Sequence, residues 1–149
     1  MEIRTATLTD LELIVPLFNA YRVFYGQESD PDAAHAFLKE RILGDESIIF
    51  FALEDNTPVG FTQLYKTFSS VSLQPSFILN DLYVTPGSRK KGIGEALLNQ
   101  AKYYCNALGY KGLSLETAVD NPAQKLYERL GWEKDEDYFH YFWKNSNPV

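Results

Sequence analysis

The sequence contains few of the residues that build disulfides or metal sites. Among its 149 residues there is one cysteine, Cys105, and there are two histidines, His35 and His140. A lone thiol cannot form an intramolecular disulfide, which suits a reducing compartment. Two histidines far apart in the chain lack the clustered spacing of metal ligands, and we expect no metal ion.

Long apolar runs and an excess of positive charge are also absent. No stretch reaches the roughly 18 consecutive apolar residues of a membrane-spanning helix, and residues 1–4 lack the apolar core of a signal peptide. We therefore expect a cytoplasmic protein that does not bind membranes. With 14 Lys and Arg against 20 Asp and Glu, the net charge is −6, which argues against nucleic acid as a partner. The acidity is compatible with a cationic substrate, and equally with solubility alone.

The length and the order of the predicted elements indicate one domain spanning residues 1–149. A capping box of Thr9 and Glu12 predicts the start of the first helix, which follows a strand at 2–6 and ends near Gly26. Asp30 and Pro31 predict the start of a second helix. This second helix ends at Gly44. The later strands are expected at 47–54, 59–68, 77–84, 113–118 and 138–144, and the later helices over 93–108, ended by Gly109, and at 122–130.

These elements predict a mixed fold. Residues 55–58 supply the turn of a β-hairpin, and strand, helix and strand within about 40 residues form a parallel crossover. We therefore predict a mixed α+β protein with a central, mostly antiparallel sheet, one parallel strand–helix–strand crossover, and helices on both faces.

Residues 89–94, Arg-Lys-Lys-Gly-Ile-Gly, lie where a strand gives way to a helix. The first main-chain amides of a helix have no partner within it, and the helix dipole adds a partial positive charge. Gly92 and Gly94 leave these amides open to a phosphate, and Arg89, Lys90 and Lys91 add three positive charges. The segment therefore predicts a diphosphate-binding site.

Two other phosphate-binding motifs fit this segment less well. A P-loop requires Gly-x-x-x-x-Gly-Lys-Ser/Thr, which is absent, and a dinucleotide fold requires a third glycine where Leu97 stands. A nucleotide-binding protein unrelated to acyl transfer is one alternative, and an ordinary glycine-containing loop is another.

Segment 89–94 and its surroundings resemble the GNAT superfamily of acyl-CoA-dependent N-acetyltransferases. The resemblance is dense over residues 79–143 and looser over the first 75. The matching sequences are Asn80-Asp81-Leu82-Tyr83-Val84-x-Pro86, Arg89-x-x-Gly92-x-Gly94-x-Ala96-Leu97-Leu98, Leu115-Glu116-Thr117-Ala118, and the run from Asn121 to Trp132. The resemblance implies acetyl-CoA as co-substrate and direct transfer to a primary amine in a ternary complex.

In this family the loop matching residues 89–94, which includes Ile93, wraps the diphosphate of coenzyme A. The strand matching 79–84 separates from the strand matching 113–118, and pantetheine lies between them along Leu82, Tyr83 and Val84. The resemblance also implies that the amide at or near Val84 faces the thioester carbonyl. A donor aimed at developing negative charge stabilises the transition state.

Tyr127 matches the family tyrosine that protonates the departing thiolate. Because the ordinary pKa of a phenol, about 10, exceeds that of a thiol, about 8.5, we expect hydrogen-bond donation first and proton transfer second. Ala123 matches a family alanine four residues before this tyrosine. The family asparagine seven residues before it is replaced by Asp120, and we expect Asn121 to contact the coenzyme instead.

The acceptor amine attacks only when neutral, so a lysine-like amine needs a base or a water relay to one. Polyamine-acetylating members of the family often carry a glutamate where Asn80 stands here, and an asparagine side chain cannot take that proton. Asp81 and Glu116 are the remaining candidates for the base. Each could equally be a structural carboxylate.

The acceptor pocket is the least defined part of the resemblance. Tyr21, Phe24 and Tyr25 match the region that shapes it, although such aromatic residues could equally belong to the core, and we assign Asn80 to the same site. We favour a small cationic amine, with protein N-termini or lysines as an alternative. A module that senses acetyl-CoA without turnover is a further alternative, and a homodimer is a reasonable expectation for a small enzyme.

Overall fold

The computed structural model describes all 149 residues, which form two compact units. The N-terminal unit spans residues 1–116 and holds the sheet and the long helices. The C-terminal unit spans residues 117–149 and contains one short helix, α4 (Gln124–Arg129). None of the helices is both long and apolar enough to cross a membrane. A single domain over 1–149 stays a prediction.

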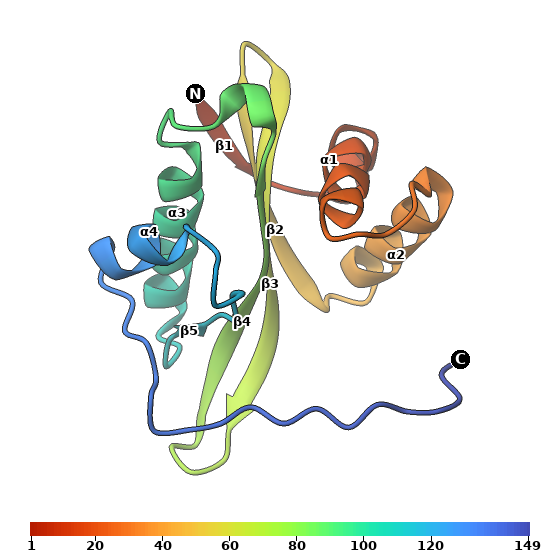
Figure 1. Cartoon of the computed structure of the whole chain (residues 1–149). Coiled ribbons are helices and arrows are strands. Elements are labelled where there is room, and N and C mark those ends of the chain that lie inside the picture. Colours follow the sequence, from red (N-terminus) through yellow and green to blue (C-terminus); the bar gives the residue numbers. More distant parts are fainter. The chain divides into compact units, whose positions relative to one another are not determined.

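A five-stranded sheet forms the centre of the N-terminal unit, with its strands in chain order (Figure 1). The first three neighbouring pairs are antiparallel and the last is parallel, which confirms the predicted mixed sheet. Asp55 and Asn56 form the hairpin turn, both with positive φ (50° and 64°), as a two-residue turn between twisted strands requires. The strands are β1 (Glu2–Thr5), β2 (Ser47–Glu54), β3 (Thr57–Ser69), β4 (Gln74–Val84) and β5 (Leu113–Ser114).

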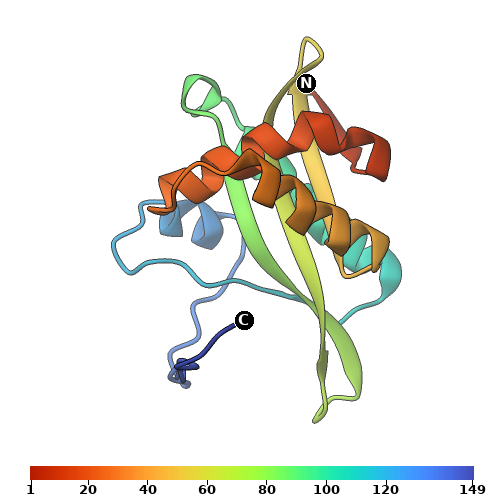
Figure 2. The ribbon, with the colours of Figure 1, turned by 90° about the vertical axis from the view of Figure 1, so that its right-hand side faces the viewer.

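Helices cover both faces of this sheet, as predicted. Helices α1 (Leu11–Phe24) and α2 (Pro31–Leu43) lie across one face (Figure 2), and α3 (Ile93–Leu108) lies on the other (Figure 1). The core under α1 and α2 includes Phe51 and Phe61, both fully buried. On the α3 face, the ring of Tyr104 meets Phe50 edge-on at 5.5 Å. Both apolar faces of the sheet are therefore removed from water, which drives its folding.

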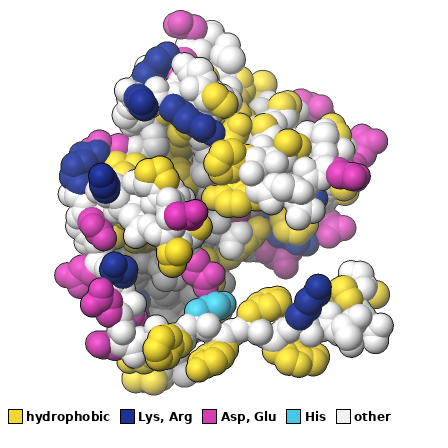
Figure 3. All heavy atoms as spheres, viewed as in Figure 1, with side chains coloured by type: hydrophobic (Ala, Val, Ile, Leu, Met, Phe, Trp, Pro, Cys, Tyr) yellow, Lys and Arg dark blue, Asp and Glu magenta, His cyan; other side chains and the backbone are white.

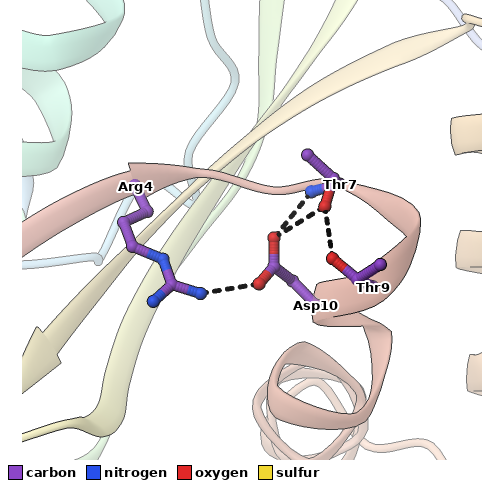
Figure 4. Close-up of polar contacts among 4 residues, drawn as sticks. All are labelled: Arg4, Thr7, Thr9 and Asp10. Carbon is purple, nitrogen blue, oxygen red and sulfur yellow. Dashed lines mark hydrogen bonds and ion pairs between the residues drawn. The ribbon is translucent and has the colours of Figure 1, made fainter.

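The start of α1 differs from the prediction. A 3₁₀ turn, η1 (Leu8–Asp10), precedes the helix, and the capping pair is Thr7 with Asp10 rather than Thr9 with Glu12. Asp10 Oδ2 accepts from the Thr7 amide at 2.8 Å, and Arg4 Nη2 lies 2.6 Å from Asp10 Oδ1 (Figure 4). The Thr9 hydroxyl bonds that of Thr7 at 2.8 Å instead of capping the helix. The capped turn forms earlier in the chain than predicted because the Asp10 carboxylate has both the Thr7 amide and the Arg4 guanidinium within reach.

The predicted ends of α2 and the predicted stop of α3 are confirmed. The Asp30 carboxylate accepts from the Ala33 amide at 3.1 Å at the start of α2, and Gly44 follows its last turn. Gly109 ends α3 in the left-handed conformation, with φ of 68°, which a glycine adopts without steric cost.

Two predicted strands are corrected. The strand expected at 113–118 pairs only at Leu113 and Ser114, and residues 138–144 form no strand although five of those seven are aromatic. Aromatic residues favour strands only where a neighbouring strand supplies hydrogen bonds and packing, and this run does not alternate apolar with polar residues. Helix α4 is shorter than the predicted 122–130.

Replacing Asp10 by Asn should make stability less sensitive to acid. Burial alone would raise the pKa of Asp10, but the bonds from Thr7 and Arg4 outweigh it and lower that pKa below 3.8. The folded protein then binds fewer protons than the unfolded chain, so this stabilisation is present above the ordinary value and is lost as the pH falls through the lowered one.

We therefore expect Asp10→Asn to reduce the free energy of unfolding by on the order of 1 kcal/mol near pH 7. The deficit should shrink towards about pH 3, as Asp10 in the parent becomes protonated. Urea denaturation of both proteins at the two pH values measures it. An equal deficit at both values would contradict this role for the Asp10 charge.

Candidate active site

Strand β4 carries one extra residue where it pairs with β3. Asp81 lies opposite Gln63 and Leu79 lies opposite Leu64, which leaves Asn80 without a partner residue on β3. This is a β-bulge. Because main-chain groups alternate between the two sides of a strand, one extra residue reverses which of them face the neighbouring strand.

Hydrogen bonds on either side of the bulge show this reversal. Before it, the Phe77 amide donates to the β5 side, at 3.0 Å from Gly112 O; after it, the Thr85 amide donates to Val59 O on β3 at 2.8 Å. By alternation, the main-chain groups of Leu82 and Val84 turn away from β3. Strand β5 pairs only with Phe77 and Ile78, so these groups lie along an edge of β4 that β5 does not cover.

The loop of residues 89–94 follows the end of β4. Lys90 and Gly92 have positive φ (64° and 82°) on either side of Lys91, and such alternation curls the main chain so that amides converge. Gly92 is the N-cap of the 16-residue helix α3 and provides no side chain to cap its first amides. The loop therefore leaves main-chain amides open to an anion, and the binding of a diphosphate there stays a prediction.

The basic side chains of this loop have different surroundings. All three are exposed, and basic groups gather over the loop beside hydrophobic ones (top of Figure 3). Lys91 Nζ lies 3.9 Å from Glu54 Oε2. The Arg89 guanidinium lies over the rings of Phe24 and Tyr83, at 5.5 and 5.7 Å, and its Nε donates to Val84 O at 2.9 Å. Arg89 thus joins the loop to α1 and β4.

Aromatic residues at the end of α1 form a cluster against β4. Tyr21 meets the ring of Tyr25 edge-on at 5.0 Å and that of Tyr83 at 6.3 Å. Phe24 lies 6.3 Å from Tyr83, which is buried, whereas Phe24 and Tyr25 are 62% and 58% exposed. The three residues of this region that were predicted to shape the acceptor pocket therefore lie together, between the core and the surface.

Beneath this cluster lies a buried carboxyl group, Asp81, which is 2% exposed. It accepts from Gln63 Nε2 at 2.5 Å and from Asn80 Nδ2 at 2.7 Å, and the Tyr21 hydroxyl nearby donates to Asn80 O at 3.4 Å. Burial raises the pKa of Asp81, although the polar side chains of Asn80, Gln63 and Tyr21 around it oppose the shift. A carboxylate of this kind is a stronger base than an exposed one.

Sequence analysis missed two members of this cluster, Gln63 and Tyr65. Both lie on β3, and the charge of Asp81 adds to burial in raising the pKa of Tyr65 to about 12. The available signal was the polar pair Thr62-Gln63 between the apolar residues Phe61 and Leu64, where a buried amide needs a partner. That partner, Asp81, is 18 residues away in sequence.

The remaining predicted site residues lie at the end of the N-terminal unit or in the C-terminal unit. Glu116 is exposed beyond β5. Asn121, Ala123 and Tyr127 belong to the C-terminal unit, where Asn121 Oδ1 accepts from the Ala123 amide at 2.9 Å and the Tyr127 ring lies 6.1 Å from that of Trp132. Their roles stay predictions.

Comparisons with known proteins agree with this fold. The sequence pattern of the Acetyltransferase (GNAT) family matches residues 13–132. The chain is 50% identical over 142 residues to YhfO, an uncharacterized N-acetyltransferase of Bacillus subtilis, covering 95% of each. The crystal structure of a probable acetyltransferase has a TM-score of 0.93 at 40% identity, covering 99% of this chain and 100% of the other. An aminoglycoside N-acetyltransferase in complex with CoA has a TM-score of 0.78 at 24% identity, covering 97% and 95%.

The mixed sheet with helices on both faces is therefore that of an acetyltransferase. The chain belongs to the acetyltransferase (GNAT) family, as the sequence motifs predicted. Enzymes of this family take the acetyl group from acetyl-CoA.

Gly60 offers a test of how closely β3, β4 and α3 are fitted together. A Cβ atom at this position would lie 2.9 Å from Tyr83 O and 3.3 Å from Ile93 Cγ2. We expect Gly60→Ala to lower the free energy of unfolding by about 1–3 kcal/mol, because the main chain of β4 must shift. Gly87→Ala is the matched control, since a Cβ there meets nothing within 4 Å. Equal stability of the two variants in urea would refute the close fit.

Proposed function

We propose that this enzyme transfers the acetyl group of acetyl-CoA directly to a primary amine within a ternary complex. One observation carries the proposal: the uncovered edge of β4 at Leu82 and Val84 runs into the amide-rich loop of residues 89–94. A thioester chain laid along that edge has main-chain hydrogen-bonding groups on one side and an anion site at its end. The membership of the family supports acetyl transfer itself.

Several residues hold the coenzyme in this proposal. The amides from Gly92 to Gly94, with the charges of Lys90 and Lys91, bind the diphosphate. The Arg89 guanidinium can bind the diphosphate as well as stack on its aromatic neighbours. The main chain of Leu82 and Val84 bonds the pantetheine amides, and Tyr83 contributes its ring. Asn121 and Ala123 add the contacts that the family resemblance implies.

The reaction follows from these positions. The amine nitrogen attacks the thioester carbon, and the C–N bond forms while negative charge develops on the carbonyl oxygen beside the Val84 amide. The C–S bond then breaks, and Tyr127 donates a hydrogen bond and finally a proton to the thiolate. The nitrogen loses its extra proton to a base, for which Asp81 and Glu116 are the candidates.

The acceptor that we favour is a small cationic amine. The exposed rings of Phe24 and Tyr25 suit a cation that is partly desolvated. Asn80 is the polar residue that we assign to the same site. The net charge of −6 attracts such a substrate, and a relative of the same fold acts on aminoglycosides. Mass spectrometry of amine panels, scored for a gain of one acetyl group, tests this against peptide N-termini and lysines. Tight coenzyme binding with no turnover would favour the sensor alternative.

Coenzyme A should raise the melting temperature of the protein, whereas ATP and NAD should not. Gly94→Asp places a carboxylate at the proposed diphosphate site, and we expect it to weaken coenzyme affinity at least about tenfold through charge repulsion. Asn99→Asp adds the same charge on an exposed position of α3 and is the control. Isothermal titration measures both. Equal affinities for the two variants would remove the loop from the binding site.

Tyr127→Phe should lower kcat about tenfold or more while coenzyme affinity stays nearly unchanged, because the variant loses only the hydroxyl that donates to the thiolate. Thiol release under saturating acetyl-CoA measures kcat, and calorimetry measures the affinity. An unchanged kcat with every acceptor would exclude Tyr127 from the mechanism.

A further inference from the structure

We propose that the rings of Phe24 and Tyr83 form a binding site for an organic cation, which the Arg89 side chain fills until the coenzyme draws it away. This inference rests on the proposed function and deepens it, because the cation is an ammonium group of the acceptor amine. It also gives the reaction an order, in which the coenzyme binds first and thereby opens the site to the amine.

The two rings hold one positive group, the guanidinium of Arg89. Its Cζ atom lies 5.5 Å from the centroid of the Phe24 ring and 5.7 Å from that of the Tyr83 ring. Both distances fall within the roughly 6 Å at which the face of an aromatic ring attracts a cation. The ring centroids are 6.3 Å apart and the ring planes are tilted by 59°, so one cation lies over both rings at once. The structure thus contains a cation site whose occupant is a side chain of the protein itself.

The position of the two rings suits a ligand that arrives from solution. Phe24 is the last residue of α1 and is 62% exposed, whereas Tyr83 belongs to β4 and is buried. The sheet and the ring of Tyr21, which meets Tyr83 edge-on at 6.3 Å, fix the buried ring, and the exposed ring leaves an approach from the surface. Arg89 is itself exposed, so its departure from the rings requires no unfolding of the core.

Arg89 also occupies a main-chain group of the edge proposed for the coenzyme. Its Nε donates to Val84 O at 2.9 Å, and this carbonyl lies on the side of β4 that faces away from β3. The polar partner of Arg89 is thus a neutral carbonyl and not a carboxylate, which would hold the guanidinium more firmly. A pantetheine chain along Leu82 and Val84 competes for the same oxygen, so the coenzyme and Arg89 exclude each other there.

The coenzyme offers the Arg89 guanidinium a stronger partner than the rings. A phosphate group accepts two parallel, charge-assisted hydrogen bonds from a guanidinium, whereas a cation over an exposed ring is held weakly. Arg89 begins the loop whose amides are proposed to bind the diphosphate, and Gly92 in the same loop is the N-cap of α3. Binding of the diphosphate therefore shifts Arg89 from the rings to the anion.

Competition for the rings couples the binding of the two substrates. While Arg89 lies over Phe24 and Tyr83, an ammonium group of the acceptor has to displace it, which lowers the affinity for the amine. Once the diphosphate holds Arg89, the same rings are open to the amine. Because such coupling is reciprocal, the amine raises the affinity for the coenzyme by the same factor. The Arg89 side chain therefore favours a ternary complex in which the coenzyme binds before the amine.

The first test is a double-mutant cycle on the affinity for coenzyme A, measured by isothermal titration without any amine. Phe24→Leu removes the exposed ring and so releases Arg89 more readily, and we expect coenzyme A to bind about threefold more tightly. In the Arg89→Met background the same substitution should change nothing, because no guanidinium remains to be released. The cycle thus separates the contact between the two side chains from any direct effect of Phe24 on the coenzyme.

The second test measures the binding of 1,3-diaminopropane, whose ammonium groups are protonated near pH 7. Without coenzyme, Arg89→Met should bind the diamine about threefold more tightly than the parent, because the rings are open. With saturating coenzyme A, which carries no acetyl group to transfer, the two proteins should bind the diamine equally. Lys66→Met is the matched control, since Lys66 Nζ lies over two other rings at 5.4 Å and its loss should leave both affinities unchanged.

Results against this cation site differ from failure of the proposed function. If Phe24→Leu leaves the coenzyme affinity unchanged or weakens it, Arg89 does not leave the rings and the inference is wrong. Equal diamine affinities of the parent and Arg89→Met without coenzyme, or no diamine binding by either, would also overturn it. A parent that binds both ligands without acetyl transfer would refute the proposed function alone, and a parent that binds no coenzyme A would refute both. Melting curves establish that each variant folds, and if Arg89→Met does not, Phe24→Leu decides alone.

Discussion

The register shift between β3 and β4 at Asn80 is the constraint on which the candidate site depends. Without the extra residue, the main-chain groups of Leu82 and Val84 would face β3 and bond within the sheet. With it, they face the edge that β5 leaves uncovered. The same residue places Asp81 opposite Gln63. One irregular position in a regular sheet thus creates both an open strand edge and a buried carboxyl site.

Strand β4 therefore borders both regions of the proposed site. Its main chain at Val84 belongs to the edge proposed for the coenzyme, whereas the side chains of Asp81 and Tyr83 face the aromatic cluster of α1. Arg89 connects the two regions, because it bonds Val84 O and lies over Phe24 and Tyr83. A change in the position of Arg89 would alter its contacts with Val84 O and with the two rings together. Arg89 therefore provides a physical link between the regions proposed for the coenzyme and for the acceptor amine.

The interior of this protein retains polar groups where apolar ones would be more stable. Gln63 and Asp81 are both buried, and one oxygen of Gln63 has no partner. Local departures from the rules of core packing concentrate at functional sites, where chemistry requires them. The capping cluster of Arg4, Thr7 and Asp10 is a contrast, because the hydrogen bonds among these residues serve the connection between β1 and α1.

The sequence by itself determined the features that depend on near neighbours: the cap at Asp30, the glycine ends at Gly44 and Gly109, and the glycine-bearing loop before α3. Local sterics and hydrogen bonds decide these within a few residues. Only the tertiary structure decided the bulge at Asn80, the bond between Gln63 and Asp81, and the absence of a strand at 138–144. Strand register and buried polar pairing join residues far apart in the chain, and no local pattern encodes which partner each will meet.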